Sequence, residues 1–516
     1  MRKKLFKPIQ IGSATALLAT TSFLSYAIGL VRDKILAFKF GATTATDAYS
    51  ASFIIPDMLF NLFIAGALVA AFLPVFSEHL AKDEKKATEI ANTVLTGGVL
   101  LISGLATIAF IFMGHIVPFL FSKSDPAMQQ SIINMTRLML PSAILFAISN
   151  TLGNVLMSYK HFIAYSISPI LYNLGIILGI IFLSDSMGIY AAAVGVLIGA
   201  SLHALIRIID VTTTSYKYKP KVNFRDPAFK KIIKLMLPKT ASLISWQINL
   251  YIFTAVGLRL MEGSVAAFNY ARNIQSFAVS LFGIAFATAV FPYLTTAFSE
   301  NKHEEYTAHI QKTVQRILFF TIPATVGLMV LAEPLVNLIL AGGAFDTQSA
   351  KLTTTILFYF GLSIPFESLV HILARAFYAR QNTLTPMIIN ISTMVVIALI
   401  TLFVAPIYGV QWFSIGFTIG FAFQVVLLSY MLRKKLQTFE FKKLSTSLLK
   451  TITSSAIMFI VLMLLAPLHD QIPSRIATLV QIALGAGTFF ISAAALKSSE
   501  ISSINYIFNR IFKKNV

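Results

Sequence analysis

The sequence contains no cysteine among its 516 residues. A disulfide, a thiolate metal site and a cysteine nucleophile are therefore excluded. Charged residues are also scarce, at 12% of the chain, against roughly 25% in an ordinary soluble domain. Hydrophobic residues make up 56%. They gather into runs that repeatedly reach the roughly 20 residues a helix needs to cross a bilayer. The composition predicts a membrane protein with many spans rather than one oversized soluble core.

Apolar segments follow one another along the whole chain, and several exceed a minimal span, as tilted or kinked helices do. Because backbone polar groups in lipid have to be satisfied within their own segment, we predict an all-α, polytopic membrane protein with about 14 transmembrane helices. The segments cover residues 10–35, 44–77, 89–121, 130–158, 162–184, 188–212, 230–260, 265–298, 308–332, 350–379, 384–407, 411–433, 448–468 and 473–496.

The net charge of +20 would suggest nucleic-acid binding in a soluble protein. Here the lysines and arginines lie mostly in short loops between apolar runs, a pattern typical of topology signals and of contacts with anionic headgroups. We therefore expect membrane lipids as partners and no nucleic acid.

Alternate loops differ in basic charge, which predicts the orientation of the chain. Loops rich in lysine and arginine stay in the cytoplasm, and both termini belong to the rich set. This requires an even number of spans, and we expect a multi-pass protein of the bacterial cytoplasmic (inner) membrane with both termini cytoplasmic. The rich loops cover residues 2–7, 82–86, 217–231, 433–443 and 510–514.

Two parts of the chain resemble each other at an offset of about 220 residues. Leu152–Tyr159 matches Leu373–Arg380 in position and character, and each is followed by a polar stretch and a proline, Pro169 and Pro386. Parallel repeats of six helices are a transporter architecture with a site between the halves. The predicted organisation is an N-lobe of helices 1–6 over 1–213, a basic cytoplasmic linker over 214–229, a C-lobe of helices 7–12 over 230–435, and helices 13–14 with a basic tail over 436–516.

Charged residues inside membrane segments usually face a cavity or a partner, so they are the informative ones. Arg32 and Asp33 lie near the end of helix 1, Asp47 opens helix 2, and Asp57 lies about three turns further on. Arginine presents a planar fork suited to phosphate. One interpretation is that Arg32 binds a pyrophosphate and the aspartates pair with it or take part in ion coupling. The other is an internal salt bridge at a helix end.

A second group of charges lies in the other half. Glu367, His371 and Arg375 stand four residues apart and share one helix face. That face either lines the cavity or forms a polar network in which Glu367 and Arg375 bracket His371. Lys239 follows a proline at the start of helix 7, where a kinked, cavity-facing turn is expected. Arg272 lies in helix 8.

Enzyme signals are absent from the sequence. It has no glycine-rich phosphate loop with a lysine, no serine elbow and no histidines at metal-ligand spacing. We therefore expect no enzyme, no cofactor and no metal. Uphill transport would need an ion gradient or the membrane potential, since one charge crossing about 100 mV is worth roughly 2.3 kcal/mol.

Eight motifs are spread in order over nearly the whole chain. They are Gly29–Asp33, Phe40–Ala42, Ala45–Ala48, Ala65–Pro74, Tyr159–Phe162, Ser168–Asn173, Leu281–Pro292 and Phe377–Pro386. Together they resemble the MurJ (MviN) family. The resemblance implies the fold of the multidrug/oligosaccharidyl-lipid/polysaccharide exporter superfamily, with two six-helix lobes and two extra helices that form a lipid-facing groove. It also implies transport of lipid II, the undecaprenyl-pyrophosphate-linked peptidoglycan precursor, from the inner to the outer leaflet by alternating access, in cell wall biogenesis and the maintenance of cell shape.

The resemblance assigns the family's cavity arginine and aspartate to Arg32 and Asp33, and its helix-2 aspartate to Asp47. Other family charges are missing. Phe60 and Asn61 stand where the family commonly has two arginines, Ala65 replaces a glutamate, and Tyr26 replaces an arginine. The helix-8 arginine falls on Asn273, with Arg272 adjacent. We expect Arg272, Lys239 and Arg375 to supply replacement charge.

The predicted site therefore has two overlapping sets of residues. The substrate-binding set is Arg32, Asp33, Asp47, Asp57, Asn61, Lys239, Arg272, Asn273 and Arg375. The coupling or gating set is Asp47, Asp57, Glu367 and His371. Lipid II is the expected substrate of a monomer, with the coupling cation left open. The alternatives are an exporter of another polyprenyl-linked glycan or an amphipathic drug, and a non-transporting interaction protein with the same fold.

Overall fold

The computed structural model describes residues 11–63, 67–433, 436 and 440–501. Within these ranges the regular structure is helical, and the one extended pairing is an isolated bridge between Gly342 and Phe345. The all-α prediction is confirmed. The chain divides into two compact units, one of Met1–Ala266 with Gly342–Asp346 and the other of Ala267–Ala341 with Thr347–Val516.

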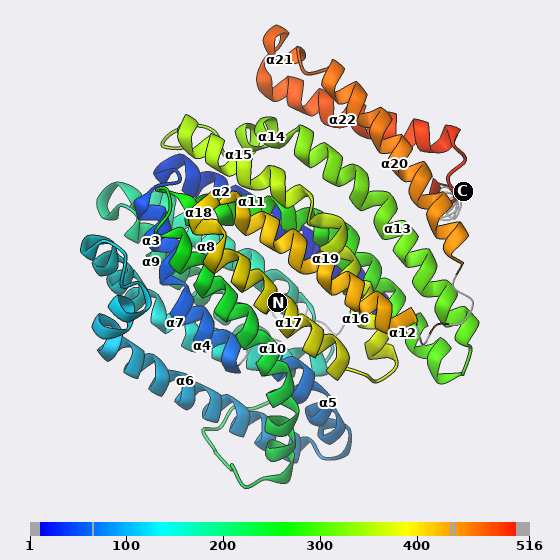
Figure 1. Cartoon of the computed structure of the whole chain (residues 1–516). Coiled ribbons are helices and arrows are strands. Elements are labelled where there is room, and N and C mark those ends of the chain that lie inside the picture. The colour runs from blue at the N-terminus through cyan, green and yellow to red at the C-terminus, as the bar shows by residue number, and fades with distance from the viewer. Residues whose placement is uncertain (1–10, 64–66, 434–435, 437–439, 502–516) are drawn as a thin grey trace. The chain divides into compact units, whose positions relative to one another are not determined.

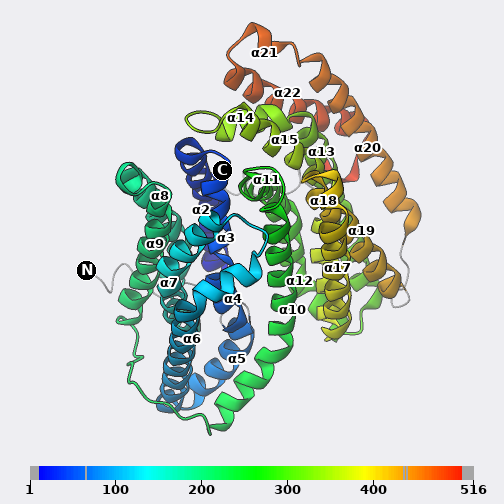
Figure 2. The same ribbon diagram turned by 60° about the vertical axis from the view of Figure 1, so that its left-hand side comes forward.

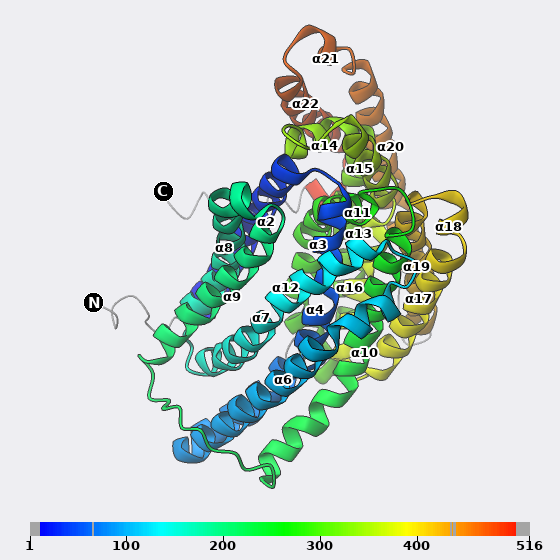
Figure 3. The same cartoon turned by 90° about the vertical axis from the view of Figure 1, so that its left-hand side faces the viewer.

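The first unit contains nine helices within its described residues. Figure 3 shows α8 and α9 running side by side next to α7. The helices are α2 (Ile11–Phe40), α3 (Thr44–Ser52), α4 (Ile54–Phe63), α5 (Ala67–Lys82), α6 (Glu84–Leu120), α7 (Pro126–Ser158), α8 (Ile163–Met187), α9 (Tyr190–Val211) and α10 (Pro227–Gly257).

Small residues let α8 and α9 approach each other closely, as is common between membrane helices. A Cβ added at Gly175 of α8 would lie 2.2 Å from the Cα of Gly199 on α9. One added at Gly179 would lie 2.5 Å from the Cα of Gly195. Each glycine is therefore required by the close backbone contact and not by a turn.

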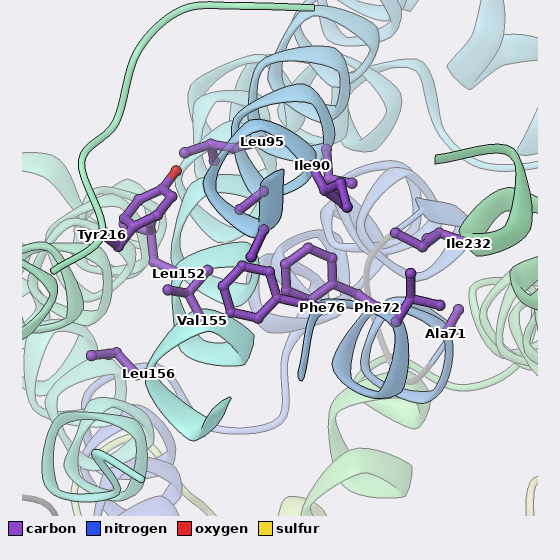
Figure 4. Packing of buried hydrophobic residues seen from close by; sticks show 14 of the residues in the cluster. Ala71, Phe72, Phe76, Ile90, Leu95, Leu152, Val155, Leu156, Tyr216 and Ile232 are labelled. Carbon is purple, nitrogen blue, oxygen red and sulfur yellow. The ribbon is translucent and has the colours of Figure 1, made fainter. Parts of the chain in front are cut away.

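A hydrophobic core, mostly aliphatic, lies among α5, α6, α7 and the start of α10 (Figure 4). Phe72 and Phe76 stack with their ring centroids 5.0 Å apart. Tyr216, in the loop between α9 and α10, enters this core and donates a hydrogen bond to the side-chain oxygen of Asn92 at 2.7 Å. Lys86 of α6 pairs with Asp226, which caps α10. These contacts fix the basic loop against α6.

The second unit holds the remaining helices. Figure 2 shows α17 and α19 side by side, and Figure 1 shows α20 and α22 next to α13. The elements are α11 (Ser264–Ala278, which begins in the first unit), the π-helical turn η1 (Val279–Ile284), α12 (Ala285–Ser299), α13 (His303–Val330), α14 (Ala332–Leu340), α15 (Thr347–Gly361), α16 (Ile364–Ala379), α17 (Leu384–Phe403), α18 (Ala405–Tyr408), α19 (Gln411–Arg433), α20 (Phe441–Leu464), α21 (Leu468–Gln471) and α22 (Ser474–Ala495).

Ten helices in the described part of the chain are long and apolar enough to cross a membrane, or eleven if α15 and α16, bent by 46°, form one span. The chain is therefore a multi-pass membrane protein. The expected segments over 10–35, 44–77 and 230–260 are not among these spans, and 44–77 is divided into α3, α4 and α5. The count of fourteen is not confirmed and stays a prediction. So does the division into two six-helix lobes; α10 packs on α4, α5 and α6 within the first unit.

Candidate functional site

The first polar cluster surrounds Arg32 on α2. Its guanidinium donates from Nε and Nη2 to one carboxylate oxygen of Asp33, at 3.0 and 2.7 Å. Its Nη1 donates to the side-chain oxygen of Asn173 on α8, at 2.9 Å. Asn173 in turn donates to the carbonyl of Pro169 at 3.1 Å, which orients its oxygen toward Arg32. Asp33 is nearly buried, whereas the Arg32 side chain keeps 24% of its surface exposed.

Two tyrosines and a further aspartate extend this cluster. Tyr49 of α3 and Tyr172 of α8 lie close enough to Arg32 to interact with it electrostatically. Asp57 of α4 interacts in the same way with both tyrosines. Within the described residues, the Asp57 carboxylate has no ion-pair partner. Arg32, Asp33 and Asp57 are therefore brought into one neighbourhood, which combines a paired cation with an anion that has no ion pair.

Asp47 lies elsewhere and has a different set of partners. Its two carboxylate oxygens accept hydrogen bonds from the backbone N–H groups of Gly263, at 2.9 Å, and Ala266, at 2.8 Å. Glu262 reciprocates by accepting from the backbone N–H and the hydroxyl of Thr44, at 2.9 and 2.7 Å. We call these contacts the helix-end brace. The N–H groups of a helix's first turn have no partner within the helix. The Asp47 carboxylate accepts from such groups at the start of α11, and the Glu262 carboxylate does so at the start of α3.

The helix-end brace depends on a glycine. Gly263 has a φ of +78°, which favours glycine, and an added Cβ would lie 2.0 Å from the carbonyl oxygen of Ala42. Asp47 is 2% exposed and bonded to backbone groups. The structure therefore does not bring Asp47 together with Arg32.

The second polar cluster lies in the second unit around Arg272 of α11. Its Nη1 and Nη2 donate to the two carboxylate oxygens of Glu367 on α16, at 2.8 and 2.7 Å. Gln275 donates to the same carboxylate at 3.0 Å and to the hydroxyl of Ser363 at 3.0 Å. The guanidinium carbon of Arg272 lies 4.9 Å from the ring centroid of Phe417, within cation–π range. This is a bidentate ion pair in a largely buried setting.

Further along α16, Arg375 donates to the hydroxyl of Thr288 on α12 at 2.9 Å and to the carbonyl of His371 at 3.3 Å. Glu367 and Arg375 therefore each have a partner on another helix, and neither makes a hydrogen bond to the His371 ring within the described residues. Asn273 is half-buried beside Arg272. The Lys239 side chain lies outside the described part of the structure.

The positions of the missing family arginines are filled by other contacts. Phe60 packs against Phe146 of α7, with ring centroids 5.2 Å apart. Asn61 donates to the backbone carbonyl of Asp57 at 2.9 Å. Tyr26 is 43% exposed, and Ala65 lies outside the described residues. The replacements visible in the structure therefore serve packing and helix geometry.

Sequence reasoning missed two residues that complete the clusters, Asn173 and Gln275. Both are amides that interrupt apolar helices, and this was the available signal. Arg207 was also not placed in a site. It is buried and donates to the hydroxyl of Ser168 at 2.8 Å and to the carbonyl of Tyr165 at 3.4 Å. Pro169 cannot donate to that carbonyl, so Arg207 partly replaces the missing helix bond.

Comparison with known proteins decides the family. The family model described as "Lipid II flippase MurJ" matches residues 36–474. The chain belongs to the MurJ family. Within that family, it is 28% identical over 434 residues to the lipid II flippase MurJ of Burkholderia cenocepacia, covering 81% of this chain and 84% of the relative. It is 25% identical over 491 residues to the probable lipid II flippase MurJ of Thermotoga maritima, covering 94% and 96%.

Solved structures agree with membership of the MurJ family. A structure described as lipid II flippase MurJ in an inward closed conformation matches with a TM-score of 0.81 and 25% identity, covering 96% of this chain and 99% of that one. An inward-facing multidrug resistance MATE family transporter of the MOP superfamily matches with a TM-score of 0.67 and 16% identity, covering 80% and 94%. The latter likeness concerns the fold alone. The predicted MurJ-like exporter fold is confirmed.

Proposed function

We propose that this protein is a flippase that moves lipid II from the inner to the outer leaflet of the bacterial cytoplasmic membrane. The observation that carries the proposal is the match to the MurJ family model over residues 36–474. A transporter of this family needs no catalytic residues, so the proposed protein is not an enzyme. We further propose, on the basis of loop charge, that both termini are cytoplasmic, and that the protein acts as a monomer.

In this proposal, Arg32 contacts the pyrophosphate of the substrate. Asp33 holds the guanidinium through Nε and Nη2, while Nη1 donates only to the neutral amide oxygen of Asn173. A phosphate oxygen is a stronger acceptor than an amide oxygen, because charge-assisted hydrogen bonds are roughly twice as strong as neutral ones. A pyrophosphate would therefore replace Asn173 at Nη1 without breaking the Asp33 pair. Asp33 acts as a positioning residue.

Asp57 is the proposed coupling group. Its carboxylate interacts with Tyr49 and Tyr172 and has no ion pair in the described part of the chain. A monovalent cation or a proton would neutralise it at a low cost in rearrangement. An ion gradient or the membrane potential would then drive transport, with about 2.3 kcal/mol available per charge at 100 mV.

Expression in a bacterial strain depleted of its own lipid II flippase tests the proposal. The unaltered chain is expected to restore growth and the exposure of lipid II on the outer leaflet. Arg32→Ala is expected to abolish both. Lys39→Ala is the control on the same helix, α2, and should preserve both, because Lys39 forms only an exposed ion pair, with Asp185 of α8. Absence of rescue by a well-expressed chain, or equal rescue by Arg32→Ala, would contradict the proposal.

A second candidate, export of another polyprenyl-linked glycan, is favoured by one observation. Phe60 forms an aromatic pair with Phe146 where the family commonly has an arginine, which removes cationic charge from the head-group region. Leaflet-accessibility assays on proteoliposomes, with lipid II and a different polyprenyl-linked saccharide in parallel, separate the two candidates. Preferential flipping of the second lipid would replace lipid II as the assigned substrate.

A further inference from the structure

Three aromatic side chains of the first unit form a series of ring contacts next to the Arg32 cluster. They are Phe60 of α4, Phe146 of α7 and Tyr172 of α8. The ring centroids of Phe60 and Phe146 are 5.2 Å apart, and those of Phe146 and Tyr172 are also 5.2 Å apart. We call these three residues the aromatic platform. It begins beside Arg32, because Tyr172 directly precedes Asn173, which accepts from Nη1 of Arg32, and itself interacts electrostatically with the guanidinium.

The residues of the aromatic platform are only partly buried. All three keep an intermediate exposure. The aromatic side chains of the hydrophobic core in the same unit differ, since Phe72 and Phe76 are both 0% exposed. Large aromatic side chains contribute most to stability when they are fully covered. The platform therefore keeps surface that a further contact can cover.

The aromatic platform shares its side of the helices with charged residues. Phe60 lies three residues after Asp57 on α4, so the two side chains share one helix face. Tyr172 interacts electrostatically with both Asp57 and Arg32. Charged side chains at bilayer depth face a cavity or a partner and not hydrocarbon. A ligand that covers the platform is therefore a polar one that approaches from the side of Arg32.

Neighbouring residues hold the rings of the aromatic platform in place. Phe146 packs against the edge of the His203 ring of α9, with centroids 5.2 Å apart, and Nδ1 of His203 is hydrogen-bonded to the hydroxyl of Ser149 at 2.8 Å. Tyr172 packs on Gly199 of α9, where an added Cβ would lie 3.0 Å from the ring carbon Cδ2. A ligand would therefore meet rings that are already ordered, which lowers the entropy lost on binding.

The aromatic platform also carries a hydrogen-bonding group. Within the described residues, the Tyr172 hydroxyl makes no hydrogen bond. Most buried or half-buried polar atoms in proteins do have such a partner. A phenol both donates and accepts. Tyr172 therefore offers a ring face and a polar group to the same ligand.

A sugar ring has the chemistry that matches these features. One face of a pyranose presents C–H groups, and the negatively polarised face of an aromatic ring attracts them. The edge of the pyranose carries hydroxyl groups, which bond to polar groups such as the Tyr172 phenol. Sites that combine several aromatic side chains with a few polar groups are typical of small-ligand binding.

We propose that the aromatic platform binds the sugar ring attached directly to the pyrophosphate of the transported lipid, while Arg32 binds the pyrophosphate. The assignment rests on the proposed flippase function and adds the residues that recognise the saccharide. Because the first sugar is bonded to the phosphate, it is the part of the head group that reaches rings next to Arg32. If the platform only packed α4 against α7 and α8, its loss would affect lipids with and without a sugar equally.

Two lipids separate recognition of the sugar from recognition of the pyrophosphate: lipid II, and undecaprenyl pyrophosphate, which lacks the saccharide. Native mass spectrometry of the full chain in detergent measures the binding of both. Phe60→Leu removes a ring and keeps an apolar side chain. It should weaken lipid II binding by about tenfold and change undecaprenyl pyrophosphate binding by less than about twofold. The retained binding of the sugar-free lipid also shows that the variant is folded.

Three control variants make the result specific. Phe60→Tyr keeps the ring and should bind lipid II as the unaltered chain does. Phe224→Leu removes a ring from the Phe224–Phe229 pair of the basic loop, whose centroids are 5.4 Å apart, and should change neither affinity. Arg32→Ala should weaken the binding of both lipids.

The outcomes distinguish failure of the platform from failure of the flippase function. Equal losses for the two lipids in Phe60→Leu, or unchanged lipid II binding, would overturn the platform and leave the flippase function standing. Binding of neither lipid by the unaltered chain would contradict the flippase function, and the platform with it.

Discussion

Among the described residues, an arginine–carboxylate pair lies in a largely buried setting in each unit, and the two pairs are built differently. In the second unit, Arg272 donates to both oxygens of Glu367, and Gln275 adds a third bond to the same carboxylate. In the first unit, Arg32 donates twice to a single oxygen of Asp33. Its remaining bond goes to the neutral amide of Asn173 on another helix.

The difference indicates different roles. A bidentate pair supported by a glutamine and by aromatic rings has satisfied both partners and joins α11 to α16. Removing one partner would therefore leave a buried charge unpaired. In Arg32, one N–H group donates to the neutral amide oxygen of Asn173, and an anion could replace that oxygen as the acceptor. The first-unit cluster is therefore the better candidate for contact with substrate.

Breaking the second-unit pair should give the largest effect on stability. Glu367→Ala leaves Arg272 buried without its carboxylate and is expected to lower the free energy of unfolding by about 3–5 kcal/mol. Asp33→Ala should cost less, because Arg32 keeps 24% of its side chain exposed and retains Asn173. Thermal and denaturant unfolding in detergent would measure both. A larger loss for Asp33→Ala would reverse the comparison.

The double variant Arg272→Met, Glu367→Ala provides the matched control. Removing both charges avoids an uncompensated buried cation, so most of the stability lost by Glu367→Ala should return. A double variant no more stable than Glu367→Ala would show that packing, and not the ion pair, determines the loss.

The helix-end brace should give the next largest effect. Asp47→Ala removes the acceptors of two buried backbone N–H groups, each costing about 1–3 kcal/mol when left unsatisfied. Asp47→Asn keeps one side-chain oxygen as an acceptor and should lose roughly half as much. Unfolding midpoints would rank the three proteins, and hydrogen exchange at Gly263 and Ala266 should rise in the same order. No change in exchange would contradict the assigned contacts.

A change at Arg32 should affect transport more than stability. Lysine keeps the charge but cannot donate to Asp33 and Asn173 with the same planar geometry. Arg32→Lys is therefore expected to slow lipid II flipping by about tenfold, equivalent to about 1.4 kcal/mol. Its unfolding midpoint should change little. Proteoliposome flipping assays and unfolding curves on the same preparation would test the pairing, and an unchanged flipping rate would exclude Arg32 from the binding site.

The smallest effect concerns acid stability. Hydrogen bonds from Thr44 lower the pKa of Glu262 below its ordinary value of 4.5. Because the folded pKa is the lower one, this contribution is present above pH 4.5 and is lost as the pH falls through the folded pKa. Glu262→Gln should remove this pH-dependent term, which is expected to be below about 1 kcal/mol at a largely exposed site. Unfolding curves at pH 7 and pH 4 would measure it, and an unchanged pH slope would contradict it.

Much of the architecture was predictable because bilayer physics acts locally. Eleven of the fourteen segments expected from length and apolarity coincide with helices long enough to span a membrane, if α15 and α16 are taken as one span. The motifs around Arg32 and Gly283 indicated the family. The sequence predicts one helix over 44–77 because apolar residues recur along it with no clear helix stop, whereas α3 and α4 are separated at Phe53. The break depends on packing of α3 and α4 against α7, which a single-segment analysis does not contain.

The sequence by itself determined the all-helical membrane fold, because the cost of exposing backbone polar groups to lipid depends on local composition. Its ordered motifs also indicated the family. The tertiary structure alone decided the partners of the charged residues. In that structure, the Asp47 carboxylate accepts hydrogen bonds from the backbone N–H groups of Gly263 and Ala266. Arg272 donates to Glu367, and Arg32 donates to Asn173. These contacts join residues 95 to 219 positions apart, and their geometry depends on how whole helices pack.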